Sequence, residues 1–529
     1  MSRTIKARLV HLGLCAVSAV LLALPYKVPG AWPVAFIAFI PYFFTLDRKS
    51  SREAFILSTA MGLFYYTLIG WWLTKVSLLG FALTALYLSL YFGVFGLVSN
   101  RFFSPNDDWE RTHLARNRRA LFFLPAFWAA LEYLRGWLIT GFPWALLAYS
   151  QWKNPLIIQI SDITGAWGVS YFVFFVNVAL FRLAELGRKK PAPPKAFVTY
   201  LTALVLVAAA VAGYGKFQLS MRDRFYADSV KKVKTRISVL QGNIPQDQKW
   251  NKQIKEIILE KYKQLLFMSA IDKSDLVVWP ETSFPGFYED EAVMAADMRR
   301  AIHQSKTEVL VGAPTMGDWE EGIRFFNSAI LFNAFGQEKA RYHKLHLVPF
   351  GEFVPWPALL GFIRDAFHIG HFAPGREYTV FSTVTRNQER NISYKFGVLI
   401  CYEDIFPNLV RNFCQRGADV MINMTNDAWF GKSEAPYQHA AASVFRAVEN
   451  RVPVVRATNT GLSCFITPEG RVTASVSEDG EEIFVSGYRA QDVYLKKGRS
   501  FYTRFGDLFM LLVLALVFLA YRDKTRQNL

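Results

Sequence analysis

The chain has 529 residues, of which 52% are hydrophobic and only 19% are charged, whereas about 25% of the residues of a typical globular protein are charged. This composition excludes a disordered or collagen-like protein, and four cysteines in so long a chain exclude a disulfide scaffold. The formal net charge of +17 would suit a nucleic-acid binder, so its distribution along the chain decides its meaning.

Residues 1–215 consist largely of long apolar runs. A membrane-spanning helix needs about 20 mostly apolar residues, and the sequence offers eight candidates, of which the second is short. They lie at 8–26, 31–46, 54–74, 77–99, 120–140, 164–184, 196–214 and 505–521. The sequence therefore predicts a polytopic α-helical membrane domain of eight spans, with seven in 1–215 and the eighth, followed by a short tail, in 505–529.

Lysine and arginine collect in alternate connections between these runs. If the N-terminus is inside, the inside segments carry 19 Lys and Arg and the short outside loops carry three. Cytoplasmic loops hold the excess of basic residues in membrane proteins, so we expect both termini in the cytoplasm and residues 216–504 outside it. The positive charge is then mainly a signal of topology, and we expect no nucleic-acid partner.

Two charged residues, Glu132 and Arg135, fall inside the fifth predicted span. Charges within a membrane span usually mark functional sites. Their spacing of three residues equally permits a mutual ion pair on one helix face with a structural role only, so both interpretations stay open at this point.

Residues 216–504 have the texture of a water-exposed α/β domain. Strand-like apolar runs lie at 236–241, 275–280, 308–314, 328–333, 394–401, 418–425 and 452–458, and helical stretches lie at 250–271, 290–305, 403–416 and 434–450. Strands that alternate with helices are typical of a largely parallel sheet. Three further strand-like runs within 463–488 follow one another without helices, which indicates an antiparallel part as well.

Cys401 is the residue most indicative of chemistry in this domain. It ends the run FGVLI and precedes a predicted helix, and a nucleophile at a sharp strand-to-helix turn is presented to a cleft. A thiol with an ordinary pKa needs a nearby base or positive charge to react. The alternative is that Cys401 is a small buried hydrophobic residue.

Two other segments favour the interpretation of Cys401 as a nucleophile. Glu281 follows the strand-like run 275–280, and Lys344 lies in a stretch punctuated by Gly and Pro. Residues just beyond the carboxyl ends of strands converge on one crevice in an α/β sheet. There Glu281 would accept the thiol proton, Lys344 would stabilise the thiolate and a developing oxyanion, and Cys401 would attack an acyl carbonyl to form a thioester.

The segments VVWPETSFPG, RYHKLHLVPFGEFVPW and GVLICYEDIFP resemble the Glu–Lys–Cys signatures of the nitrilase, or carbon–nitrogen hydrolase, superfamily. With spans before and after them, nearly the whole chain resembles the bacterial apolipoprotein N-acyltransferases. Further matching segments are GFPWALLAYSQ (141–151), QGNIPQDQKW (241–250), NMTNDAWFG (423–431) and RATNTG (456–461). The resemblance implies an α-β-β-α sandwich for residues 216–504.

The resemblance also implies an activity and its residues. The family moves an acyl chain from a phospholipid to the α-amine of a diacylglyceryl-modified N-terminal cysteine of an apolipoprotein, which is the last step of lipoprotein maturation in the bacterial inner membrane. The reaction is ping-pong through a thioester on the position of Cys401, with Glu281 as the base and Lys344 at the oxyanion. The other matching positions are Glu352, Tyr402, Glu403 and Asn327 as active-site support and Trp250 and Trp429 as aromatic residues that handle substrate.

Several further expectations complete this interpretation. We expect a monomer without a cofactor, and no metal, because the eight histidines show no ligand spacing. The apolar and aromatic residues of 354–374 suit contact with the bilayer surface, although a helix packed on the domain core would carry the same pattern. A disulfide between Cys414 and Cys464 stays open, since three cysteines lie in this domain.

Two other functions fit parts of the sequence. A membrane-tethered amidase or nitrilase-type hydrolase would use the same three residues with water as acceptor. A polytopic transporter with an inert nitrilase-like domain would not need them, and the predicted spans lack paired Gly- or Pro-broken helices of the transporter kind. Release of free fatty acid without an amine acceptor would distinguish the hydrolase from the acyltransferase.

Overall fold

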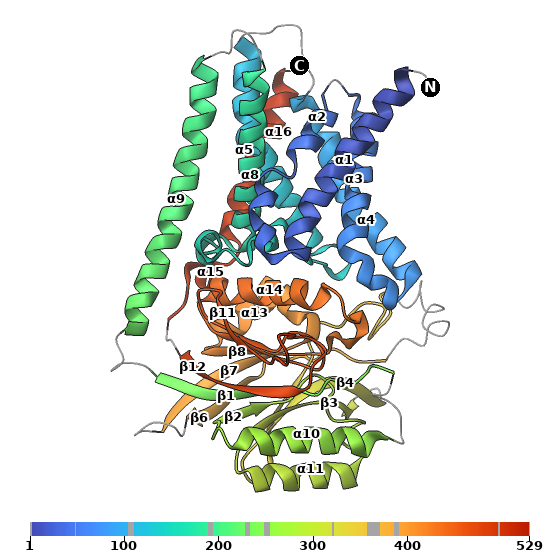
Figure 1. Ribbon diagram of the computed structural model, residues 1–529, viewed down its shortest axis with the longest axis vertical. Coiled ribbons are helices and arrows are strands. Elements are labelled where there is room, and N and C mark those ends of the chain that lie inside the picture. Colours follow the sequence, from blue (N-terminus) through green and yellow to red (C-terminus); the bar gives the residue numbers. More distant parts are fainter. Residues whose placement is uncertain are drawn as a thin grey trace. The chain divides into compact units, whose positions relative to one another are not determined.

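The computed structural model describes residues 3–47, 49–103, 111–188, 194–227, 233–247, 254–319, 322–356, 371–385, 391–495 and 498–527. The chain forms two compact units, one of Met1–Arg222 with Phe505–Leu529 and one of Asp223–Arg504. The first unit is helical and the second contains all the described strands (Figure 1). We call them the membrane unit and the catalytic unit.

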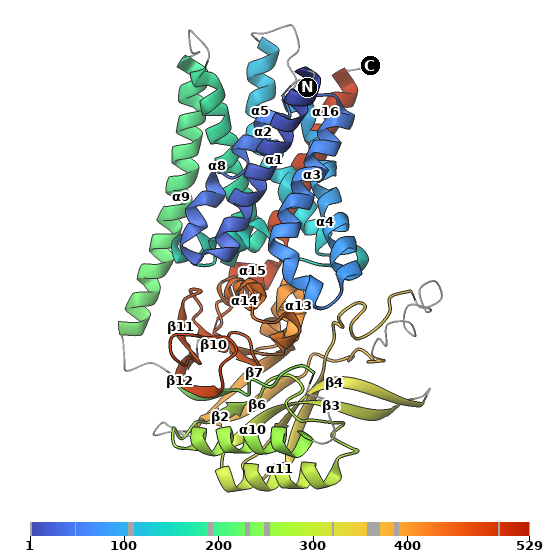
Figure 2. The ribbon, with the colours of Figure 1, turned by 45° about the vertical axis from the view of Figure 1, so that its right-hand side comes forward.

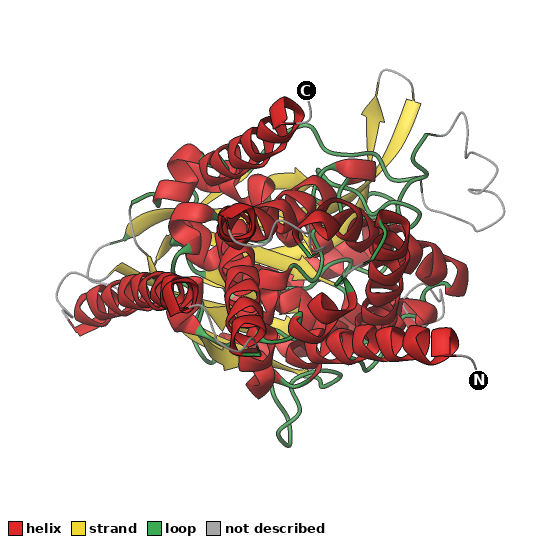
Figure 3. Cartoon of the chain, turned by 90° about the horizontal axis from the view of Figure 1, so that it is seen from above, coloured by secondary structure: helices red, strands yellow, loops and turns green. Residues whose placement is uncertain are grey.

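Among the described residues, the membrane unit contains seven longer helices and several short ones. Figure 3 colours the helices of the whole chain red. The longer helices are α1 (Arg3–Lys27), α3 (Ser51–Gly70), α4 (Leu78–Ser99), α5 (Arg111–Arg135), α8 (Ala166–Gly187), α9 (Pro194–Ala227) and α16 (Leu508–Gln527). The short ones are η1 (Pro29–Phe36), α2 (Ile40–Thr45), η2 (Trp71–Lys75), η3 (Asn100–Phe102), η4 (Leu138–Thr140), η5 (Leu147–Gln151), α6 (Pro155–Ile158) and α7 (Ser161–Thr164).

Five of the eight expected spans are helices long and apolar enough to cross a membrane among the described residues. They are Ile5–Lys27, Ser51–Lys75, Leu78–Ser99, Ala166–Gly187 and Pro194–Met221. The expected span 31–46 is divided into η1 and α2, with Pro33 and Pro41 removing backbone donors. The last expected span, 505–521, corresponds to α16, which begins after Gly506 (φ of 61°) and is separated by it from α15 (Phe501–Phe505). These two and 120–140 stay predictions.

Glu132 and Arg135 both connect the end of α5 to the segment that follows it. Glu132 Oε1 accepts a hydrogen bond from the backbone N–H of Leu147 at 2.7 Å. Arg135 donates to the carbonyl oxygen of Trp144 at 3.1 Å and to the hydroxyl of Tyr66. The two charges therefore position residues 144–147 within the membrane unit, a role beyond that of a mutual ion pair.

The catalytic unit contains two six-stranded sheets, ordered β12-β1-β2-β3-β4-β5 and β11-β10-β9-β8-β7-β6. The first is made of β1 (Val233–Gln241), β2 (Leu276–Val278), β3 (Glu308–Trp319), β4 (Gly322–Phe332), β5 (Glu338–His343) and β12 (Gly487–Leu495). The second is made of β6 (Val380–Thr385), β7 (Ile392–Ile400), β8 (Val420–Thr425), β9 (Val454–Thr458), β10 (Cys464–Ile466) and β11 (Val472–Ser475). Each sheet has three parallel central strands, β1-β2-β3 and β7-β8-β9, with antiparallel strands outside them.

Helices cover the outer face of each sheet, so the unit is the expected α-β-β-α sandwich (Figure 2). The helices α10 (Lys255–Ala270) and α11 (Ala292–Ser305) bury an apolar face against the first sheet, where Tyr262, Leu266 and Met298 pack in its core. The helices α13 (Pro407–Gln415) and α14 (Ala435–Asn450) contact β7 and β9 of the second sheet. Contacts of β1 with β9 and of β4 with β7 join the sheets.

Some local predictions for this unit were wrong. The strands β5 and β6 were not predicted, because edge strands need no continuous apolar run. The expected helix 403–416 is divided into η8 (Cys401–Ile405) and α13, since Pro407 has no backbone N–H to continue a helix. The last strand is β12 at 487–495, later than the run expected at 481–488, and it pairs with β1.

Candidate active site

Cys401 lies at an abrupt turn between β7 and η8. Its φ is +55°, a left-handed conformation that costs a residue other than glycine on the order of 1–3 kcal/mol. The side-chain amide of Asn423, on the neighbouring strand β8, donates to the carbonyl oxygen of Cys401 at 2.8 Å and holds the turn. The half-buried thiol is therefore presented as a nucleophile at a strained elbow would be.

Glu281 lies just beyond β2 and is only 7% exposed. The turn that carries it packs closely on β3, and it continues into Thr282 at a φ of +46°. A Cβ atom on Gly312 would lie 2.2 Å from the carbonyl oxygen of Pro280 and 2.8 Å from the Cα atom of Glu281. Position 312 thus has room for glycine only, and this close approach sets where the carboxylate sits.

Lys344 directly follows β5, and its ammonium group is enclosed by acceptors. Its Nζ atom lies 3.0 Å and 2.9 Å from the two carboxylate oxygens of Glu352 and 3.8 Å from Oε1 of Glu281. The amide of Asn327, on β4, donates to Glu281 at 2.8 Å and to Glu352 at 2.9 Å. The four side chains form one buried network with two carboxylates and one cation.

The charges in this network set the protonation states around Cys401. Burial disfavours the Lys344 ammonium, but Glu352, Glu281 and Cys401 outweigh it and raise the pKa of Lys344, which stays protonated. Burial, followed by the carboxylate of Glu281, raises the pKa of the Cys401 thiol well above its usual value, while Lys344 lowers it. The resting group is therefore a thiol, and its reaction requires transfer of the proton to a neighbouring base.

Glu403 holds the nucleophile turn from behind. Its carboxylate accepts hydrogen bonds from the Tyr342 hydroxyl at 2.9 Å and from the backbone N–H groups of Leu345 at 2.7 Å, His346 at 2.9 Å and Ile400 at 2.7 Å. Burial raises its pKa to about 7, although these donors oppose the shift. Glu403 ties the start of η8 to the segment after Lys344, which makes it a positioning residue.

The other predicted residues are placed differently. Tyr402 is buried, and among the described residues its hydroxyl has no hydrogen-bond partner. Trp429 is 51% exposed on η9 (Asp427–Phe430). Trp250 lies outside the described residues, as does most of 354–374, of which Trp356 is exposed. Cys414 and Cys464 are both buried and are not joined by a disulfide.

Sequence reasoning missed several polar residues of this region. Asn423 was not assigned a role, and neither were Asp404, Asp427, His439 and Arg456, which form a fully buried cluster. Four of the five lie in quoted motifs: Asp404 in GVLICYEDIFP, Asn423 and Asp427 in NMTNDAWFG, and Arg456 in RATNTG. A carboxylate within a largely apolar run, as for Asp404 in GVLICYEDIFP, is the signal that could have found that residue.

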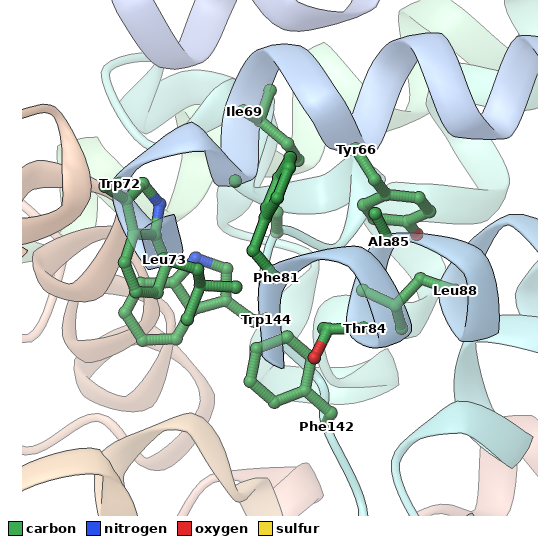
Figure 4. A pocket seen from close by; sticks show the side chains of 12 residues that line it. Tyr66, Ile69, Trp72, Leu73, Phe81, Thr84, Ala85, Leu88, Phe142 and Trp144 are labelled. Carbon is green, nitrogen blue, oxygen red and sulfur yellow. The ribbon is translucent and has the colours of Figure 1, made fainter. Parts of the chain in front are cut away.

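The membrane unit contains the pocket shown in Figure 4. It lies among α3, η2, α4 and the segment 142–145, and it is lined by Tyr66, Ile69, Gly70, Trp72, Leu73, Phe81, Thr84, Ala85, Leu88, Phe142, Trp144 and Ala145. This lining contains no carboxylate, thiol or amine. Its polar side-chain groups are the hydroxyls of Tyr66 and Thr84 and the indole N–H groups of Trp72 and Trp144.

Comparisons with known proteins decide the family. A family model for carbon-nitrogen hydrolases matches residues 236–495, and one for the apolipoprotein N-acyltransferase N-terminal domain matches residues 18–179. The chain is 36% identical to an apolipoprotein N-acyltransferase of Geobacter metallireducens, over 94% of this chain and 92% of that protein. The chain belongs to the apolipoprotein N-acyltransferase family. The resemblance inferred from its motifs is confirmed.

Other proteins are similar to this chain over both units or over the catalytic unit alone. An apolipoprotein N-acyltransferase of Pasteurella multocida is 28% identical, over 90% of this chain and 88% of that protein. An amidase from Nesterenkonia sp. is 18% identical, over 51% of this chain and 92% of that chain, with a TM-score of 0.36. The fold class and the enzyme class, an N-acyltransferase, agree with the predictions, whereas the number of spans stays a prediction.

Proposed function

We propose that this N-acyltransferase moves a fatty acyl chain from a membrane phospholipid to the α-amine of the N-terminal S-diacylglyceryl-cysteine of apolipoproteins, through a thioester on Cys401. The observation that carries the proposal is the buried network of Glu281, Lys344, Glu352 and Asn327 around a thiol at a strained turn. The names of the relatives support an apolipoprotein acceptor. The five long apolar helices support a membrane location.

In the first half-reaction the Cys401 sulfur attacks the ester carbonyl carbon of the phospholipid. Glu281 takes the thiol proton as the carbon–sulfur bond forms, because a thiol with a raised pKa does not ionise first. The Lys344 ammonium stabilises the oxyanion of the tetrahedral intermediate. The intermediate then expels the lysophospholipid alkoxide, which receives the proton from Glu281, and the acyl group remains on sulfur as a thioester.

In the second half-reaction the neutral amine of the apolipoprotein attacks the thioester carbonyl. Glu281, again a carboxylate, takes one proton from the attacking nitrogen. The tetrahedral intermediate expels the Cys401 thiolate, which regains that proton from Glu281, and the amide product leaves. The enzyme returns to its starting protonation state, so one carboxylate serves both steps.

Glu352 and Asn327 support this cycle by holding Lys344 and Glu281. Glu352 makes the shorter contacts to the ammonium, 2.9 Å against the 3.8 Å of Glu281. Glu352 therefore holds the charged Lys344 in place while Glu281 exchanges a proton with the substrate and the thiol. We infer that Tyr402 supports the active site and that Trp250 and Trp429 bind substrate. We also infer that one chain suffices as a monomer and that the site works at the periplasmic face of the bacterial inner membrane.

The test is intact-mass measurement of the purified protein in phospholipid micelles without an acceptor. We expect an added fatty acyl mass that hydroxylamine removes, that Cys401→Ala abolishes, and that a diacylglyceryl-cysteine peptide discharges onto its amine. Cys414→Ala, which removes a buried free thiol elsewhere, is the matched control and should keep the adduct. Steady release of fatty acid without an adduct would instead indicate a hydrolase, and no turnover at all would indicate an inert domain.

A further inference from the structure

A fully buried cluster of charged side chains lies behind the nucleophile turn. His439, on α14, is central to it. Its Nε2 atom lies 2.8 Å from Oδ1 of Asp404 on η8, and its Nδ1 atom lies 2.9 Å from Oδ1 of Asp427 on η9. Arg456, on β9, donates to Oδ2 of Asp404 at 2.6 Å and to the Ser443 hydroxyl at 2.7 Å. One imidazole therefore joins the helix that begins with Cys401 to the turn that carries Trp429.

Asp427 is the member of the cluster that acts on the nucleophile. Asp427 and Cys401 follow the ends of the neighbouring parallel strands β8 and β7, on which Met424 pairs with Ile400. The Asp427 carboxylate raises the pKa of the Cys401 thiol, after the larger effects of burial and Glu281. Its Oδ2 atom accepts no hydrogen bond from the described residues, and Nη2 of Arg456 is 3.9 Å away. A Cβ atom on Gly461 would lie 2.1 Å from this oxygen, so the carboxylate is closely confined. The His439 imidazole, at 2.9 Å, therefore lies nearer to the Asp427 carboxylate than the Arg456 guanidinium does, at 3.9 Å.

The groups that face His439 keep it charged. They are the carboxylates of Asp404 and Asp427 and the guanidinium of Arg456. Burial lowers the pKa of the imidazole and Arg456 does so too, but the two carboxylates outweigh them and raise this pKa to about 9. The cluster then holds two negative and two positive charges, which is the balance that a buried group of ions requires.

We propose that His439, as an imidazolium, is a positioning residue for acyl transfer that neutralises Asp427 beside Cys401 and so allows the thiol to give its proton to Glu281. It acts through Asp427 and does not touch the reacting atoms. This inference rests on the proposed function, because Cys401 must be the nucleophile for the effect to matter. A neutral residue at 439 leaves a buried carboxylate uncompensated beside the thiol, which makes formation of the thiolate less favourable.

The experiment measures the reactivity of the Cys401 thiol directly. Full-length protein in detergent is treated with iodoacetamide at pH 8, and alkylation of the Cys401 peptide is followed by mass spectrometry. Raising the pKa of a thiol by one unit lowers its thiolate fraction about ten-fold, and the greater nucleophilicity of that thiolate reduces the effect to about three-fold. We expect His439→Gln to slow alkylation by about three-fold or more.

A second substitution separates charge from packing. Adding Asp427→Asn to His439→Gln removes the uncompensated charge, so we expect alkylation to return to within about two-fold of the wild-type rate. Ser443→Ala removes hydrogen bonds from the same cluster without changing its charge, and we expect a lower melting temperature with an unchanged alkylation rate. An unchanged rate in His439→Gln, or a double variant as slow as the single one, overturns the proposal.

The two proposals fail in different ways. Alkylation needs neither phospholipid nor acceptor, so the His439 effect is measured even if no thioester forms. A missing acyl adduct in wild-type protein refutes the thioester mechanism, whatever the alkylation rates are. An adduct in wild-type protein together with equal alkylation of all variants refutes the role of His439 alone.

Discussion

A single methyl group at position 312 tests whether the site depends on the exact position of the Glu281 carboxylate. Gly312 lies in β3, where this strand passes the turn that carries Glu281. In Gly312→Ala the new Cβ atom would meet the carbonyl oxygen of Pro280 at 2.2 Å and the backbone N atom of Thr282 at 2.8 Å. All these contacts are to backbone, so no flexible side chain can move away and relieve them.

The size of the effect follows from these distances. Ordinary contact of a Cβ atom begins near 3.4 Å, so the turn or the strand must shift by about 1 Å. A misplacement of about 1 Å in an active site costs on the order of 100-fold in rate. Overpacking of this kind destabilises a fold by about 1–3 kcal/mol, so we expect a protein that folds with a lower melting temperature and forms the Cys401 thioester about 100-fold more slowly.

The assay is the rate of acyl-adduct formation by intact-mass measurement, with the melting temperature recorded on the same preparation. Gly317→Ala is the matched control on the same strand, because its Cβ atom would meet only the Phe326 side chain at an ordinary 3.5 Å. We expect this control to keep the wild-type rate. Our account of the Glu281 turn would be refuted by a folded Gly312→Ala variant with wild-type rate, or by equal losses in both variants.

Three further outcomes follow from the same contacts. Lys344→Met leaves two buried carboxylates without their cation. We expect the free energy of unfolding, measured by chemical denaturation, to fall by about 3–5 kcal/mol, and we expect no detectable acyl adduct. A wild-type rate of adduct formation would contradict the oxyanion role of Lys344. Tyr342→Phe removes one donor to buried Glu403 and should cost about 1–3 kcal/mol, with most of the acylation rate kept. For His439 the folded pKa, about 9, exceeds the unfolded one of about 6.5. The charged His439 imidazole therefore stabilises the fold by about 3 kcal/mol. This stabilisation is complete below pH 6.5 and is lost as the pH rises through 9. Between pH 6.5 and 9 the melting temperature of wild type should fall more steeply than that of His439→Gln. Parallel curves would contradict the raised pKa of His439 in the folded protein.

The chemistry of the catalytic unit was accessible from sequence because it depends on residues at the ends of strands. Glu281 and Cys401 each follow a short apolar run, and runs of that kind become the buried central strands of the two sheets. Lys344 was placed by its motif alone, since β5 before it is an edge strand with charged residues and has no apolar run. The positions of these three residues were predicted, and their catalytic roles stay proposals.

Neighbours in sequence do not share an environment, and this limits what sequence reasoning can assign. Tyr402 and Glu403 are adjacent, yet the Tyr402 hydroxyl has no partner among the described residues, whereas the Glu403 carboxylate binds Tyr342. Glu132 and Arg135 are three residues apart and bind different atoms of the segment after α5. A 3-10 turn and a helix end direct successive side chains to different partners, which a linear spacing does not reveal.

The sequence by itself determined five apolar helices, most of the strands and helices of the catalytic unit and the motifs that carry Glu281, Lys344 and Cys401. Each of these depends on local apolar patterning or on a short motif. Only the tertiary structure decided the charge around Cys401. Asp404, Asp427, His439 and Arg456 lie on η8, η9, α14 and β9. They meet because the strands β7, β8 and β9 pair in parallel and α14 packs against β9 and η8. A buried charge is stabilised by partners in space, and those partners are set by packing, which no local pattern specifies.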